Sequence, residues 1–141
     1  MTIRPAALAL GFAAALSACG GSRRPPATIP RPERTFAAVG AVETGMASWY
    51  GPGYHGNRTS CGDRFDQDAL TAAHPTWACG TQVRVTFLAT GRSVVVHIND
   101  LFPAHKGRII DLSRGAAKAI GLIGPGTGEV RLEVVEQAPT P

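Results

Sequence analysis

The sequence predicts a mainly β fold, built as a small barrel or a sandwich. Glycine (17 residues) and proline (11 residues) are frequent in a chain of 141, and this favours tight turns over helices. Several short segments alternate apolar and polar residues, which is the pattern of half-buried strands. Turn signals separate these segments. A closed barrel would also remove the exposed strand edges that a sandwich keeps.

The first part of the folded region is expected to hold one strand and a long loop. Residues 46–50 read as a strand that ends at a Gly-Pro-Gly turn. The following segment, 54–63, is polar and contains glycine, so it is expected to be mostly loop. Residues 69–74 form a short apolar stretch whose type the pattern does not decide.

The second part shows clearer periodicity. Residues 81–87 alternate and predict a half-buried strand, and a Thr-Gly turn leads into a β-branched strand over 92–98. Ser113 is a suitable N-cap for a short helix over 114–120, which Gly121 would end. The last strand is expected over 129–135, where alternation returns.

The N-terminal region has the features of a lipoprotein leader. Arg4 supplies a positive charge, and an apolar run too short to span a bilayer follows. The sequence Leu16-Ser17-Ala18-Cys19 resembles the bacterial lipobox, in which the cysteine is lipidated. We therefore expect a signal peptide over 1–18, a Pro- and Arg-rich tether over 19–44, the folded domain over 45–136 and a tail over 137–141. The expected location is a membrane-anchored lipoprotein that faces the periplasm, on the outer membrane.

The net charge is modest and positive, at +4. The chain shows no cluster of basic residues interleaved with aromatics and no zinc-finger pattern, so nucleic acid is not expected as a partner. A mild positive balance suits an anionic polymer such as a bacterial cell wall. The histidines show no metal-ligand spacing, so neither a metal nor another cofactor is expected.

Two cysteines remain once Cys19 is lipidated. Cys61 and Cys79 would lie in an oxidising compartment, where an even pair is most simply a disulfide. A catalytic thiol and a zinc site built on this pair are the less favoured alternatives. The disulfide would tie the loop around residue 61 to the turn before the 81–87 strand.

The segment 94–113 contains the candidate catalytic carboxylate. An apolar β-branched run ends at Asn99-Asp100, and a second apolar run ends at Asp111. A buried strand that delivers Asp100 at its end holds a carboxylate on a rigid element. The alternative is that Asp100 only caps a turn. Asp111 is expected to structure the start of the helix, because a carboxylate is favourable near a helix N-terminus.

The domain resembles the rare lipoprotein A family. The resemblance runs from Gly45 to Val135, through sequences that include Gly45-Met46-Ala47-Ser48-Trp49-Tyr50-Gly51, Leu70-Thr71-Ala72-Ala73-His74, Ile98-Asn99-Asp100 and Gly107-Arg108-Ile109-Ile110-Asp111-Leu112-Ser113. It implies a six-stranded double-psi β-barrel. It also implies a septal lytic transglycosylase that cuts peptidoglycan glycan strands from which the peptides have been removed.

The resemblance places the family's implicated residues on Asp63, His74 and Asp100. Asp100 would be the acid, Asp63 would stabilise positive charge or act as base, and His74 would orient a carboxylate or take a proton. Each has a structural alternative: Asp63 as a turn residue and His74 as a hydrogen-bonded core residue. Substrate contacts are assigned to four further residues, which are Trp49, Tyr50, His55 and Asn99.

The expected function is that of a lipid-anchored endolytic lytic transglycosylase that leaves 1,6-anhydro ends during cell wall remodelling and septation. Its expected partners are glycan strands, the membrane through Cys19, and septal cell-wall proteins. The alternatives are a non-catalytic glycan-binding or septal scaffold module, and a hydrolase that leaves reducing ends.

Overall fold

The structure, a computed structural model, describes residues 33–105 and 107–140. The expected signal peptide, the lipidated Cys19 and most of the expected tether lie outside the described residues. Within them, no helix is long and apolar enough to cross a membrane.

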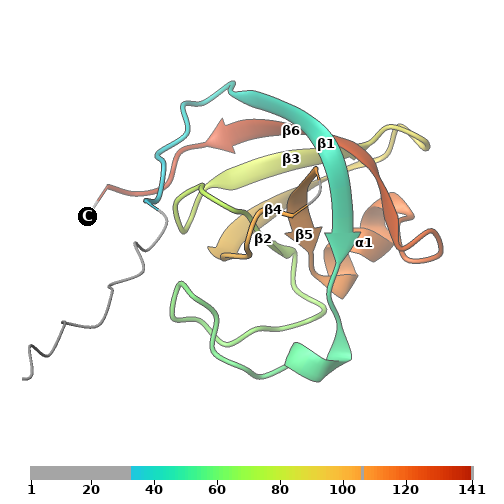
Figure 1. Cartoon of the computed structure of the whole chain (residues 1–141), viewed down its shortest axis with the longest axis horizontal. Helices are drawn as coiled ribbons and strands as arrows, with labels where there is room; N and C mark the ends of the chain where they lie inside the picture. The colour runs from blue at the N-terminus through green and yellow to red at the C-terminus, as the bar shows by residue number, and fades with distance from the viewer. Residues whose placement is uncertain (1–32, 106, 141) are drawn as a thin grey trace, which may run out of the picture. The chain divides into compact units, whose positions relative to one another are not determined.

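Six strands close into a barrel (Figure 1), with neighbours in the order β1-β5-β2-β4-β3-β6. Their bounds are β1 Val42–Trp49, β2 Thr71–Ala73, β3 Gln82–Phe87, β4 Ser93–Asp100, β5 Arg108–Leu112 and β6 Thr127–Glu136, with a short 3₁₀ turn η1 at Pro52–Tyr54 and the helix α1 at Arg114–Ile120. The pairs β1/β5 and β2/β4 are parallel, and the other four pairs are antiparallel. The fold is a six-stranded double-psi β-barrel, as expected from the resemblance.

The barrel interior is filled by the apolar residues of the alternating strands. In β3, Val83, Val85 and Phe87 are buried while the residues between them are not. Ile98 of β4 and Leu132 of β6 are fully buried in the same core. The alternation visible in the sequence therefore marks the inner face of the barrel, where burial of these side chains stabilises the fold.

Two expected elements differ from the structure. β1 begins at Val42, four residues before the expected start at Met46, because the residues from Val42 onward already pair with β6. The undecided stretch 69–74 contains the three-residue strand β2, which lies between β4 and β5. The first residues of β1 and the three residues of β2 show too little alternation to be recognised as strands from periodicity.

The helix forms as expected. The Ser113 hydroxyl accepts a hydrogen bond from the Ala116 amide at 3.1 Å, and Gly121 ends the helix in the left-handed conformation at φ 82°. The helix buries Ala116, Ala117 and Ile120 against the barrel.

The long loop between β1 and β2 is held by a disulfide. Cys61 and Cys79 are bonded, and the loop runs below the strand ends in Figure 1. The bond joins the middle of this loop to the turn before β3, as expected from the cysteine count. The loop thus covers the end of the barrel where β4 ends.

Candidate active site

The candidate site begins with a row of four residues across neighbouring strands. Ser48 of β1 is paired with Asp111 of β5, Asp111 with Ala73 of β2, and Ala73 with Asp100 of β4. Residues paired in this way present their side chains on the same face of a sheet. The small Ala73 therefore lies between two carboxylates.

A bulge in β4 turns Asp100 toward this row. Ala72 is paired with Ile98, but the next residue, Ala73, is paired with Asp100, so Asn99 is an extra residue in β4. Without that extra residue, Asp100 would share the inward face of the buried Ile98. Bulges of this kind re-aim a side chain beside functional sites.

Three residues of the row, Ala73, Asp100 and Asp111, line a pocket of about 180 Å³. The pocket is lined by Tyr50, Tyr54, Ala73, Asp100, Leu101, Phe102 and Asp111. Adjacent strands are about 4.8 Å apart, so the Cα atoms of the two aspartates, one on each side of Ala73, are roughly 10 Å apart. The pocket is thus an acidic cleft with aromatic walls, a surface suited to sugar rings.

The two aspartates have different surroundings. One oxygen of Asp100, Oδ1, accepts hydrogen bonds from the Ser60 amide (2.9 Å), the Ser60 hydroxyl (2.5 Å) and the Leu101 amide (2.9 Å). These three donors hold Oδ1 of Asp100 in one orientation.

The pKa of Asp111 is raised by its surroundings. Burial raises the pKa of Asp111, and the charge of Asp100 raises it further; the Ser48 hydroxyl, which donates at 2.7 Å, and Arg108 at 3.8 Å oppose this without cancelling it. The two carboxyl groups of the pocket thus differ in their contacts: three donors hold Asp100, whereas Asp111 is half-buried beside Ser48 and Arg108. The expectation that Asp111 structures the helix start was wrong: Ser113 caps the helix, and Asp111 points into the pocket.

Tyr50 lines the same pocket as the two aspartates. Burial raises the pKa of Tyr50, and the charges of Asp100 and Asp111 raise it further, so the phenol stays protonated. Its ring stacks on Phe65 with centroids 4.5 Å apart. Among the described residues the hydroxyl oxygen is buried and has no hydrogen-bond partner. A fixed donor without a partner in a pocket is suited to bind a substrate oxygen.

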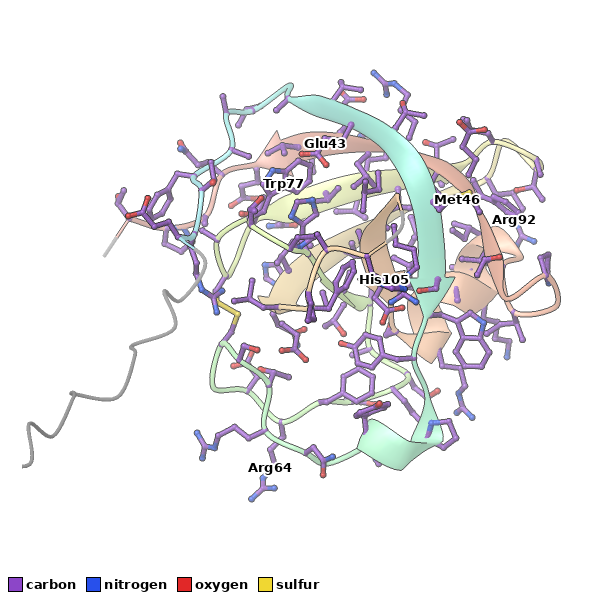
Figure 2. The ribbon with its side chains drawn as sticks, in the orientation of Figure 1. Glu43, Met46, Arg64, Trp77, Arg92 and His105 are labelled. Carbon is purple, nitrogen blue, oxygen red and sulfur yellow. A yellow bond between two sulfur atoms is a disulfide. The ribbon has the colours of Figure 1, made fainter. Side chains whose placement is uncertain are left out.

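His74 belongs to a separate buried cluster. Its Nδ1 accepts hydrogen bonds from the Thr76 and Trp77 amides at 3.2 and 3.0 Å, and its Nε2 faces Glu43 Oε2 at 3.4 Å. The ring stacks on Trp77 at 4.0 Å, and Figure 2 shows Trp77 and Glu43 close together. Burial lowers the pKa of His74 to about 4, so the ring is neutral near pH 7.

The pocket thus contains one of the three expected catalytic side chains, Asp100. Asp63 is exposed, and its backbone oxygen accepts a hydrogen bond from the Thr59 amide at 2.8 Å. Neither Asp63 nor His74 lines the pocket, although the His74 amide donates to the Asp100 carbonyl at 3.2 Å. Their catalytic roles stay predictions. The missed residue is Asp111, whose sequence signal was its place in an alternating strand with Ile110 and Leu112 buried on either side.

Of the four expected substrate-binding residues, Tyr50 lines the pocket. Trp49 packs against the barrel core, as expected when two successive residues of a strand face opposite sides of the sheet. His55 accepts a hydrogen bond from the Gln67 amide at 3.2 Å, and Asn99 is buried at the bulge. No group of three or more His, Cys, Asp or Glu side chains among the described residues could hold a metal.

The fold and this pocket define a double-psi β-barrel protein with an acidic, aromatic-walled surface site. The family model described as lytic transglycolase matches residues 42–132. The chain belongs to this family.

Several curated proteins are similar to the chain. It is 56% identical over 100 residues to a Synechocystis protein named "Probable endolytic peptidoglycan transglycosylase RlpA", covering 71% of this chain and 31% of that protein. It is 52% identical over 101 residues to the Campylobacter jejuni "Endolytic peptidoglycan transglycosylase RlpA", covering 72% and 37%. The chain therefore spans about a third of the length of these relatives.

Solved structures share the fold. The Streptomyces papain inhibitor has a TM-score of 0.58 at 24% identity, over 70% of this chain and 97% of that one. An apo expansin of Clavibacter michiganensis has a TM-score of 0.57 at 25% identity, over 72% and 54%.

Proposed function

We propose that this domain is an endolytic lytic transglycosylase that cuts the glycan strands of peptidoglycan. The observation that carries the proposal is the row that places Asp100 and Asp111 on either side of Ala73 in one pocket. The names of the relatives support the same substrate.

In the proposed reaction, Asp111 is the general acid. It gives its proton to the glycosidic oxygen as the bond from that oxygen to C1 of the sugar breaks, and positive charge grows on the sugar. A carboxyl group whose pKa is raised by burial suits this step because it gives up its proton less readily to water than a free aspartate does. The leaving glycan departs with a new hydroxyl group.

Asp100 completes the reaction as the carboxylate. It stabilises the positive charge and then takes the proton from the C6 hydroxyl of the same sugar, whose oxygen bonds to C1 and gives a 1,6-anhydro end. No water is consumed, and a proton returns from Asp100 to Asp111 through solvent before the next turnover. The Tyr50 hydroxyl donates to a sugar oxygen, and the exposed ring of Tyr54 offers a stacking surface at the pocket wall.

The expected lipid anchor at Cys19 would hold the domain at the membrane facing the periplasm, close to the cell wall. Cell wall remodelling at the septum and preference for peptide-free strands belong to the same proposal.

The test is product analysis. The protein is incubated with peptide-free glycan strands, and the products are identified by mass spectrometry. We expect 1,6-anhydro ends from the wild type, and a loss of rate of about a hundredfold or more in Asp111→Asn and in Asp100→Asn. Glu129→Gln, an exposed carboxylate change on β6, is the matched control and should keep the wild-type rate.

Other outcomes separate the alternatives. Reducing ends in place of anhydro ends would identify a hydrolase. Binding to strands without any turnover would support a non-catalytic glycan-binding module. Full activity in Asp111→Asn would remove that residue from the chemistry.

A further inference from the structure

Asp100 is held by a residue forty positions earlier in the chain. Ser60 donates both its amide and its hydroxyl to Asp100 Oδ1, at 2.9 and 2.5 Å. The hydroxyl distance is typical of a charge-assisted bond to a carboxylate. No other side chain among the described residues donates to this aspartate. The Ser60 side chain is therefore the side-chain contact that fixes the carboxylate.

The Ser60 loop is itself tied to the strand that carries Asp100. The next residue, Cys61, donates its amide to the Asn99 carbonyl at 3.3 Å and forms the disulfide with Cys79. On the far side of the disulfide, the Gly80 amide donates to the Ile98 carbonyl at 2.7 Å. Both ends of the disulfide are thus bonded to the end of β4.

The two carboxylate oxygens of Asp100 have different hydrogen-bond contacts. Oδ1 receives all three of the hydrogen bonds that the described residues donate to Asp100, and Oδ2 receives none of them. Since Asp100 lines the pocket, Oδ2 is the oxygen left for substrate. Rotation of the carboxylate away from this orientation would break the bonds from Ser60.

We propose that Ser60 is a positioning residue for the reaction, which orients the Asp100 carboxylate through its hydroxyl and is kept in place by the Cys61–Cys79 disulfide. This inference rests on the proposed function. Ser60 does not line the pocket, so it acts through Asp100 and not on the substrate.

The first experiment measures kcat and KM of Ser60→Ala and Ser60→Thr on peptide-free glycan strands. Alanine removes the hydroxyl but keeps the amide bond, so kcat should fall about tenfold or more, the scale of one hydrogen bond to a charged group, while KM stays near the wild-type value. Threonine keeps the hydroxyl, and the exposed position has room for its methyl group, so it should restore most of the rate. Ser93→Ala, another exposed serine, is the matched control.

The second experiment tests the link to the disulfide. The wild type and Ser60→Ala are assayed before and after reduction, with circular dichroism to confirm that both remain folded at the assay temperature. Reduction should lower the kcat of the wild type severalfold and that of Ser60→Ala by a smaller factor, because the contact that the disulfide maintains is already lost.

Three results would overturn the assignment of Ser60. These are a wild-type kcat in Ser60→Ala, an equal loss in alanine and threonine variants, and a loss carried by KM alone. A parallel measurement needs no activity: the fall in Tm of the double variant Ser60→Ala/Asp100→Asn should be smaller than the two single falls added together. If the wild type shows no turnover but this coupling is present, the proposed function fails while the contact stands; additive changes in Tm would reject the contact itself.

Discussion

The buried His74 should make the stability of the domain fall as the solution is acidified. Its ring is stacked on Trp77, is 2% exposed and accepts two backbone hydrogen bonds through Nδ1. Those amides can only donate, so a proton on Nδ1 would remove both bonds. The perturbation is therefore a change of pH from 7 to 4.

The magnitude follows from the pKa of His74 in the two states. Burial lowers this pKa from 6.5 to about 4 in the folded protein. Above pH 6.5 the ring is neutral in both states and the folded state keeps its full stability. Between pH 6.5 and pH 4 the unfolded chain takes up a proton that the folded chain does not, so the free energy of unfolding falls. One pKa unit corresponds to about 1.4 kcal/mol, so the loss approaches about 3 kcal/mol.

The assay is urea unfolding at several pH values, compared between the wild type and His74→Gln. Glutamine can accept from the two amides and donate toward Glu43, but it does not titrate. We expect the wild type to lose about 3 kcal/mol more than His74→Gln between pH 7 and pH 4. Because burial raises the pKa of Glu43, protonation of that carboxyl favours the folded state as the pH falls, and Glu43→Gln in both backgrounds removes this opposing contribution.

Parallel pH profiles for the wild type and His74→Gln would refute the reasoning. They would mean that His74 titrates alike in the folded and unfolded chains, and hence that its ring is hydrated or moves out of the cluster when it is charged.

Three further predictions follow from the packing. Gly115→Ala should lower Tm by several degrees, because its Cβ would be 2.3 Å from a backbone oxygen, whereas Gly53→Ala, which meets nothing within 4 Å, should leave Tm almost unchanged in the same thermal scan. Reduction of the disulfide between Cys61 and Cys79 should lower the free energy of unfolding by about 3 kcal/mol, measured by urea unfolding with and without reductant; an unchanged midpoint would contradict this. Tyr50→Phe should keep or slightly raise Tm because it removes a buried hydroxyl without a protein partner, yet it should raise KM for glycan strands, and an unchanged KM would exclude this hydroxyl from binding.

Much of the barrel could be predicted from periodicity. The strands β3 and β6 alternate over six or more residues, and β4 carries a β-branched run. The helix carries both its caps in the sequence, at Ser113 and Gly121. The strand β2 has three residues, too few to show a period. Its position between β4 and β5 depends on pairing between distant segments, which a single sequence does not display.

The site could be predicted only in part, because it too depends on pairing between distant segments. Asp100 is predictable because it ends a strongly apolar strand, and Tyr50 because an aromatic ring can stack on a sugar. Asp111 was assigned to the helix start because only two residues separate it from the helix. Its place in the pocket depends on cross-strand neighbours, Ser48 on one side and Ala73 on the other, and on the bulge at Asn99 that aligns the row.

The row of paired residues also makes the spacing of the two aspartates independent of the segments that line the rest of the cleft. The spacing of the aspartates is set by backbone hydrogen bonds of a closed sheet, whereas Tyr54, Leu101 and Phe102 reach the cleft from connecting segments outside the strands. Exchange of those connecting segments is therefore expected to change the shape of the cleft while the spacing of the two aspartates is preserved. The same barrel could then carry different connecting segments around the cleft.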